Sequence, residues 1–187
     1  MVKIRLYIAG KVSPDSVFGT HAWRDVFCAK LEQKSGYEIV NLDPTKSSKE
    51  FDLNEKDYKL IVGRDCFMIN MADLVVVNLT DDISVGGSQE MLIAKYFKKP
   101  LIGIAPKGGK FNKEEKEILG KKYREYIDPF VAIPCDRVLQ NIDELADVIR
   151  KEYTELIQNP KTISVLDDAL NYYQSHFHDK DLILHEK

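Results

Sequence analysis

The chain has 187 residues, of which 44% are hydrophobic and 30% charged, and its net charge is −3. This length and composition predict one soluble globular domain, extended at most by a terminal segment. The slightly acidic balance excludes the basic surface typical of nucleic-acid-binding proteins, and no apolar run is long enough to cross a membrane.

Short apolar runs recur along the chain and alternate with longer segments of helical spacing. Such runs, rich in β-branched residues, predict strands, and apolar residues three or four apart predict helices. In chain order, the predicted strands are 3–10, 37–44, 72–80, 99–106 and 130–135. The predicted helices are 21–36, 54–72, 88–99 and 141–157, with one more over 164–177.

The spacing also predicts which sides of the first two helices are buried. The first helix places Ala22, Val26, Ala29 and Leu31 on one side, and the second does so with Tyr58, Ile61, Val62, Asp65, Ile69 and Ala72. We expect these sides to face the sheet.

Strands that alternate with helices predict right-handed crossovers and a mostly parallel sheet. Several strands are apolar throughout, as expected when helices cover both faces of the sheet. We therefore expect a three-layer α/β domain of about five parallel strands over residues 1–159, followed by a C-terminal helical extension over residues 160–187. Such sheets bind ligands at the carboxyl ends of their strands, here residues 9–13, 43–46, 80–90 and 106–110.

The segment 84–90, SVGGSQE, follows the third predicted strand. Gly86 and Gly87 allow the backbone to approach a ligand closely. The next helix is predicted to begin near Ser88, which places Glu90 in its first turn, where the helix dipole favours an ionised carboxylate. Such a carboxylate beside a ligand site fits a nucleophile. The alternative is that Glu90 only stabilises the helix.

Asp65 is the second carboxylate of interest, because it shares the apolar side of its predicted helix. A carboxylate in such a place is costly unless it is paired or used. The alternatives are an ion pair with Arg64, or a helix turned slightly towards solvent. Two carboxylates in one pocket suit glycosidic-bond chemistry, in which one attacks or stabilises the anomeric carbon and the other handles protons.

Several motifs together resemble the nucleoside 2-deoxyribosyltransferase family over roughly residues 3–150. LYIAG is similar to the opening strand of the family and its glycine. RDCFMINMADLVVVNL is similar to its Asp followed by an AD pair and a strand, and SVGGSQEMLIAKYFKKPLIGI to its glycine-rich turn, catalytic Glu and helix. DPFVAIPCDRVLQNIDEL is similar to its closing region. The resemblance implies a flavodoxin-like (Rossmann-like) fold and a homodimer or larger homo-oligomer.

The resemblance also implies roles for single residues. Glu90 takes the position of the nucleophile that forms a glycosyl-enzyme at C1′, and Asp65 that of the Asp that helps to protonate the leaving base. Gly10 lines the sugar and base pocket, and Ser84 contacts the 5′ end of the sugar.

The chain departs from the family pattern at three places in these motifs. Transferases of the family carry Asp at the Ser84 position, whereas the related 2′-deoxynucleoside 5′-phosphate N-hydrolases carry Ser, which suits a 5′-phosphate. Gly87 and Ser88 replace a common Gly-Thr pair, and Lys11 follows Gly10 where many members have Pro or Ser. The predicted substrate-binding residues are Gly10, Lys11, Ser84, Gly86, Gly87 and Ser88.

For the remaining candidate residues, the sequence favours structural roles. His176 and His178 have no further ligand at metal spacing and are predicted to lie in a solvated tail. The segment PKGGK, residues 106–110, is predicted to be a flexible loop or a lid, and the charged stretch from Lys107 to Lys122 a solvated face. Asp43 either contacts the base or turns the chain. Trp23 and Phe27 are expected in the core or an interface, with base stacking by Trp23 left open.

We therefore expect an enzyme that cleaves the N-glycosidic bond of nucleosides or their 5′-monophosphates, with transfer to another base or to water, and without a metal or organic cofactor. The alternatives are a non-catalytic nucleotide-binding module and an NAD-type glycohydrolase. The partner is a small nucleoside or nucleotide. The three cysteines are few and widely spaced, which indicates reduced thiols, and the N-terminus does not resemble a signal peptide. We expect a cytoplasmic protein.

Overall fold

The computed structural model describes residues 3–10, 22–47 and 56–184. Its centre is a sheet of five parallel strands in the order β2-β1-β3-β4-β7. The strands are β1 (Lys3–Ala9), β2 (Glu38–Leu42), β3 (Leu74–Asn78), β4 (Leu101–Ile104) and β7 (Arg137–Leu139). The all-parallel sheet and the three-layer flavodoxin-like fold confirm the predicted fold class.

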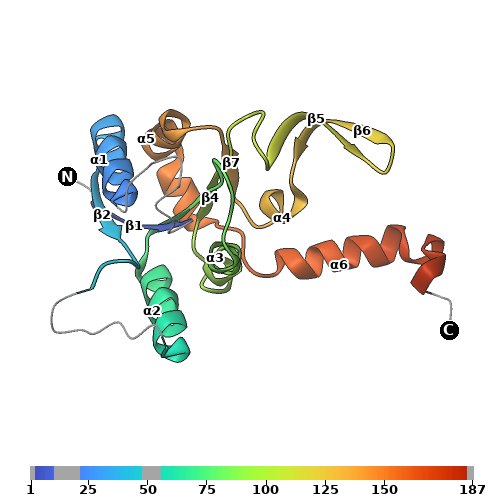
Figure 1. Cartoon of the computed structure of the whole chain (residues 1–187), viewed down its shortest axis with the longest axis horizontal. Helices are drawn as coiled ribbons and strands as arrows, with labels where there is room; N and C mark the ends of the chain where they lie inside the picture. Colours follow the sequence, from blue (N-terminus) through green and yellow to red (C-terminus); the bar gives the residue numbers. More distant parts are fainter. Residues whose placement is uncertain (1–2, 11–21, 48–55, 185–187) are drawn as a thin grey trace.

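Helices cover both faces of the sheet (Figure 1). One layer contains α1 (Trp23–Ser35) and α5 (Ile142–Gln158), and the other contains α2 (Tyr58–Met71) and α3 (Val85–Tyr96). The strands alternate accordingly: Ile4, Leu6 and Ile8 of β1 pack with α1 and α5, whereas Tyr7 and Ala9 face α2 and α3.

The strand order places a reversal of direction between β1 and β3. From β1 the chain moves outward to β2, and β3 then pairs with the other edge of β1. In sheets of this type, such a reversal marks a crevice at the carboxyl ends of the two strands, where ligands bind.

The fifth strand was predicted wrongly at residues 130–135. That segment begins with the short helix α4 (Pro129–Ala132), and β7 follows it at the edge of the sheet. Asp128 caps this helix by accepting a hydrogen bond from the Phe130 N–H at 3.0 Å, and Pro129 occupies its first turn. The apolar run alone is compatible with a strand or a helix, and the cap at Asp128 favours the helix.

A hairpin of β5 (Asn112–Ile118) and β6 (Lys121–Ile127) occupies most of the stretch predicted as a solvated face. Leu119 and Gly120 join the two strands, with φ of 50° and 76°. Two positive φ values in a row are typical of the tight turn that joins paired strands. The alternating Lys and Glu residues leave these strands with little apolar pattern, so their period was not visible in the sequence.

The predicted buried side of α1 was correct for Leu31 but wrong for Ala22, Val26 and Ala29, which are exposed. Trp23, Phe27 and Leu31 are buried, together with Arg24, whereas Val26 is 46% exposed. The charged side chain of Arg24 is on the buried side of the helix. It interrupts the apolar spacing from which that side was predicted. On α2, Ile69 is buried as predicted, but Tyr58 and Val62 are exposed.

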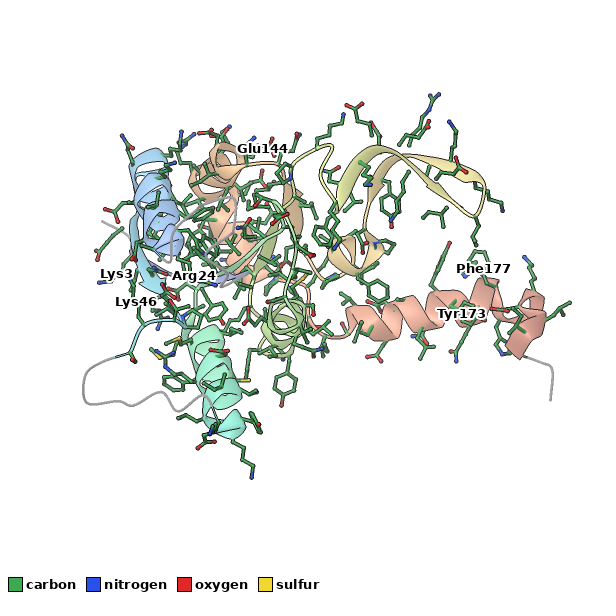
Figure 2. The ribbon with its side chains drawn as sticks, viewed as in Figure 1. Lys3, Arg24, Lys46, Glu144, Tyr173 and Phe177 are labelled. Carbon is green, nitrogen blue, oxygen red and sulfur yellow. The ribbon has the colours of Figure 1, made fainter. Side chains whose placement is uncertain are left out.

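The predicted additional helix is present as α6 (Val165–His176), which is followed by the short helices η1 (His178–Lys180) and η2 (Leu182–Leu184). No residue of α6 is buried, and Figure 2 shows Tyr173 and Phe177 far from the sheet. The segment that leads into α6 is attached to the domain through Asp136. This residue forms a buried ion pair with Lys95 of α3 at 2.5 Å, and it also accepts a hydrogen bond from the backbone N–H of Lys161, shortly before α6. No helix in the described ranges is long and apolar enough to cross a membrane.

Candidate active site

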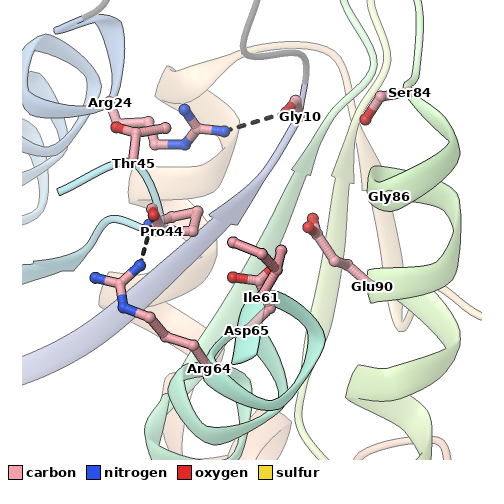
Figure 3. A pocket seen from close by; sticks show the side chains of 10 residues that line it. All are labelled: Gly10, Arg24, Pro44, Thr45, Ile61, Arg64, Asp65, Ser84, Gly86 and Glu90. Carbon is pink, nitrogen blue, oxygen red and sulfur yellow. Dashed lines mark hydrogen bonds between the residues drawn. The ribbon is translucent and has the colours of Figure 1, made fainter. Parts of the chain in front are cut away.

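A pocket of about 210 Å³ lies at the carboxyl ends of β1 and β3, in the crevice described above. Its walls come from both helical layers and from the turn after β2 (Figure 3). The lining residues are Gly10, Arg24, Pro44, Thr45, Ile61, Arg64, Asp65, Ser84, Gly86 and Glu90. Residues from five separate parts of the sequence therefore meet here.

Five of the predicted site residues line this pocket, namely Gly10, Asp65, Ser84, Gly86 and Glu90. Gly87 is buried beside Ile83, and a Cβ added to it would lie 3.0 Å from the Ile83 side chain. Ser88 is exposed, and its hydroxyl donates to the Val85 carbonyl at 2.7 Å. Lys11 lies outside the described residues.

Helix α3 begins three residues earlier than the sequence predicted. Ser84 is its N-cap, and the Ser84 hydroxyl oxygen accepts the Gly87 N–H at 3.0 Å. Gly86, Gly87 and Ser88 therefore belong to the first helical turn rather than to a glycine-rich loop, and Glu90 lies in the second turn. The prediction that the helix dipole acts on a first-turn Glu90 was wrong.

Gly10, directly after β1, lies close to side chains of β3 and α1. A Cβ at this position would lie 3.3 Å from the Cβ of Asn78 and 3.3 Å from Cη2 of Trp23. A side chain here would require these neighbours to shift, so the close packing of β1 against β3 and α1 favours glycine. Trp23 and Phe27 are buried in the core, as expected.

Glu90 has an unusual carboxyl group. Burial raises its pKa to about 7, and the charge of Asp65 adds to the rise, while Tyr7 and Arg24 act in the opposite direction. The group is therefore partly protonated at neutral pH, unlike the fully ionised carboxylate expected from the sequence.

Asp65 projects from α2 into the same pocket. Burial raises its pKa, as the sequence predicted, and the charges of Arg64 and Arg24 reduce the rise. Arg64 donates to the carbonyls of Pro44, at 2.6 Å, and Lys46. It thereby ties α2 to the turn after β2.

Tyr7 was not predicted as a site residue. It is fully buried in the middle of β1 on the side of α2 and α3. Burial raises the pKa of its hydroxyl, as do the charges of Glu90 and Asp65. The Tyr7 hydroxyl is close enough to Glu90 to lower the pKa of that group, although its oxygen makes no hydrogen bond of standard geometry to another described residue. A hydroxyl within the apolar run LYIA of β1 was the available signal.

The turn after β2 forms another wall. Asp43 accepts hydrogen bonds from the backbone N–H of Thr45 at 2.9 Å and from its hydroxyl at 2.7 Å. Of the two alternatives for Asp43, the structure supports a turn, which presents Pro44 and Thr45 to the pocket.

Two further segments lie outside the pocket lining. Asp82, just before Ser84, accepts a hydrogen bond from Lys110 of the PKGGK segment at 2.7 Å. His176 and His178 lie on the extension, and no group of three His, Cys, Asp or Glu residues in the described ranges is arranged to hold a metal ion.

No protein-family model and no curated protein matches the chain. A solved structure of a conserved protein from Enterococcus faecalis V583 matches it with a TM-score of 0.60 and 16% identity, over 80% of this chain and 99% of that one. A 2-deoxyribosyltransferase from Bacillus psychrosaccharolyticus matches with a TM-score of 0.51 and 13% identity, over 84% and 97% of the two chains. The chain has the fold of a 2-deoxyribosyltransferase. At these identities the likeness shows the fold alone.

The pocket combines two carboxyl groups with raised pKa values and two arginines, and the buried hydroxyl of Tyr7 interacts with one of the carboxyl groups, that of Glu90. Carboxyl groups that titrate near neutral pH can exchange protons with a substrate, and an ionised one can attack an electrophilic carbon. The N-terminus of α3 and the Ser84 hydroxyl add hydrogen-bond donors at one end. These groups can bind a small polar molecule and exchange protons with it.

Proposed function

We propose that this protein cleaves the N-glycosidic bond of nucleosides or their 5′-monophosphates through a glycosyl-enzyme intermediate on Glu90. The observation that carries the proposal is the meeting of Glu90 and Asp65 in one pocket at the crevice between β1 and β3. The fold shared with a 2-deoxyribosyltransferase supports it.

In the first step, an ionised Glu90 oxygen attacks C1′ of the sugar. The C1′–N bond breaks, its electron pair passes to the base, and Asp65 supplies a proton, so the base leaves neutral. In the second step, water or another base attacks C1′, the C1′–O bond to Glu90 breaks with its electron pair on Glu90, and the proton of the attacking group returns to Asp65. The raised pKa values of both carboxyl groups let the pair hold one proton near neutral pH, and the reactive form is the one in which Asp65 carries this proton and Glu90 is ionised.

The 5′ end of the sugar is placed at Ser84 in this proposal. The hydroxyl of Ser84 and the first N–H groups of α3 lie at the same end of the pocket. Helix N-termini favour anions, and a serine does not repel a phosphate. The proposal therefore includes 5′-monophosphates among the substrates.

The alternatives remain a non-catalytic nucleotide-binding module and an NAD-type glycohydrolase. A binding module has no need of two converging carboxyl groups with raised pKa values. NAD cleavage is the same chemistry on a larger substrate, but the sequence shows no clear second-nucleotide motif.

One incubation separates these functions. The protein is mixed with NAD and with a panel of nucleosides and 5′-monophosphates, with and without a second free base, and the products are separated by chromatography. Free base alone indicates hydrolysis, and a new nucleoside indicates transfer. Nicotinamide released from NAD alone indicates the glycohydrolase. Binding of panel members without any product contradicts the enzymatic proposal.

A homodimer or larger homo-oligomer is part of the same proposal. Apolar side chains are exposed on α2, such as Tyr58, Val62 and Phe67, and on α6, such as Leu166 and Leu170. Exposed apolar patches often mark contacts with another chain, and these side chains are the candidates for one. Sedimentation velocity at several protein concentrations measures the state directly.

A further inference from the structure

Arg24 is a buried cation that the steps above leave without a role. It lies in the first turn of α1 and is 2% exposed. Its Nε donates to the Ile8 carbonyl at 3.0 Å and its Nη2 to the Gly10 carbonyl at 3.1 Å (Figure 3). The side chain thus crosses the end of β1 from the α1 layer and reaches the pocket between β1 and α3.

This guanidinium has bonding capacity left over. It carries five N–H groups, and its hydrogen bonds to the described residues use only Nε and Nη2. Within the described ranges it also forms no ion pair with a carboxylate, although the Trp23 ring packs against it at 4.4 Å. The nearest compensating charges are the Asp65 and Glu90 carboxyl groups, on whose pKa values Arg24 acts without a hydrogen bond. Buried N–H groups without an acceptor are costly, so a ligand that accepts hydrogen bonds here would recover part of that cost.

The position of Arg24 indicates which part of a substrate it meets. Figure 3 shows Arg24 and Thr45 on one side of the pocket, Ser84 on the other, and Glu90 between them. C1′ has to lie at Glu90 for attack. The base and the 5′ group leave a nucleoside sugar at opposite ends of the ring, so a 5′ group at Ser84 directs the base towards Arg24.

We propose that Arg24 binds the carbonyl oxygen beside the glycosidic nitrogen of the leaving base, and that the site thereby prefers 2-oxopyrimidines. This inference rests on the proposed function. As Glu90 bonds to C1′, the electron pair of the breaking C1′–N1 bond passes to the base and is shared with O2. A guanidinium N–H beside O2 stabilises this charge more in the transition state than in the ground state. Adenine has no carbonyl group and gains nothing from Arg24.

The test compares kcat/KM for 2′-deoxycytidine and 2′-deoxyadenosine, and for their 5′-monophosphates, in the native protein and in Arg24→Gln. We expect the native protein to prefer the cytosine substrates, and Arg24→Gln to lower that preference by about tenfold or more. Arg24→Lys should retain part of it, because it keeps the charge. Equal losses on cytosine and adenine substrates would show that Arg24 only holds the end of β1, and would overturn the inference.

Arg5→Gln is the matched control. Arg5 is an arginine of β1 itself. It donates to both carboxylate oxygens of Asp73, but it does not line the pocket. Its loss should lower the melting temperature without changing the base preference. A change in preference as large as that of Arg24→Gln would mean that loosening β1 alone alters selectivity.

A second measurement avoids any folding defect of the variants, because it changes only the substrate. The native protein is given deoxyribosides of 2-pyridone and 4-pyridone, leaving groups of similar acidity in which the carbonyl lies beside or opposite the glycosidic nitrogen. We expect the 2-pyridone substrate to react about tenfold faster or more. Equal rates overturn the inference and leave the proposed function standing. No base release from any substrate in either experiment contradicts the proposed function itself.

Discussion

Glu90 and Asp65 lie on the neighbouring helices α3 and α2, and their carboxyl groups share one pocket. Burial raises the pKa of Glu90 to about 7, and the charge of Asp65 is the next cause. At neutral pH the pair can therefore hold a proton that either group alone in water would have lost. The protonation of this pair therefore affects both the pH dependence of folding stability and the proposed proton transfer.

Glu90→Ala should remove nearly all turnover while the fold persists, because the substitution deletes the nucleophile and no described residue forms an ion pair with Glu90. The measurement is base release by chromatography, together with circular dichroism of the variant. In the native protein, a 2-fluoro-substituted sugar should trap a covalent adduct on Glu90, visible by mass spectrometry. Full activity in Glu90→Ala would end the covalent proposal.

The raised pKa of Glu90 predicts a pH-dependent effect on stability. A carboxyl group whose pKa is higher in the folded state favours folding while it is protonated, and this contribution is lost as pH rises from about 4.5 towards 7. The amide in Glu90→Gln cannot ionise. The melting temperature of this variant should therefore increase relative to that of the native protein as the pH is raised from 5 to 8. Calorimetry at both pH values measures the difference. Parallel pH curves for the two proteins would contradict the raised pKa.

Asp65→Asn should lose most activity on poor leaving bases and less on activated ones, because an amide cannot donate the proton that a poor leaving group needs. The measurement is kcat/KM for an unactivated nucleoside and for one with an activated leaving group. A small and equal loss on both substrates would mean that Asp65 has a structural role.

Ser84→Asp should reverse the preference between a 5′-monophosphate and a free nucleoside. We expect the native protein to favour the monophosphate by about tenfold or more, since a charge-assisted hydrogen bond contributes about 1.5–3 kcal/mol. Asp can also cap α3, so the substitution adds charge while keeping the N-cap. Ser84→Asn is the matched control, because it caps the helix without a charge. A native preference for the free nucleoside would refute this role for Ser84.

Lys95→Met should strongly destabilise the protein. Lys95 is fully buried, and its removal leaves the Asp136 carboxylate buried with only N–H groups such as those of Leu101 and Lys161 for partners. Breaking such a pair costs about 3–5 kcal/mol, which chemical denaturation can measure. Lys3→Met is the control, because the Lys3–Glu38 pair is exposed and contributes about 1 kcal/mol or less. Similar losses in both variants would contradict the importance of the buried pair.

Local sequence patterns determined much of this protein. The apolar runs marked four of the five strands of the sheet, and the rule that ligands bind at strand carboxyl ends placed Gly10, Ser84 and Glu90 near one another. Asp65 was found because a carboxylate interrupted an apolar stripe. Such signals are readable because strand and helix periods and costly burials are properties of short segments.

Tertiary structure decided what short segments leave open. The run at 130–135 is compatible with strand or helix, and the Asp128 cap and the position of β7 select the helix. Tyr7 and Arg24 belong to the site only because β1 and α1 meet α2 and α3 at the crevice. The protonation state of Glu90 likewise depends on burial and on Asp65, which lies 25 residues earlier in the chain. Solvation and charge act through space, so the sequence alone cannot determine them.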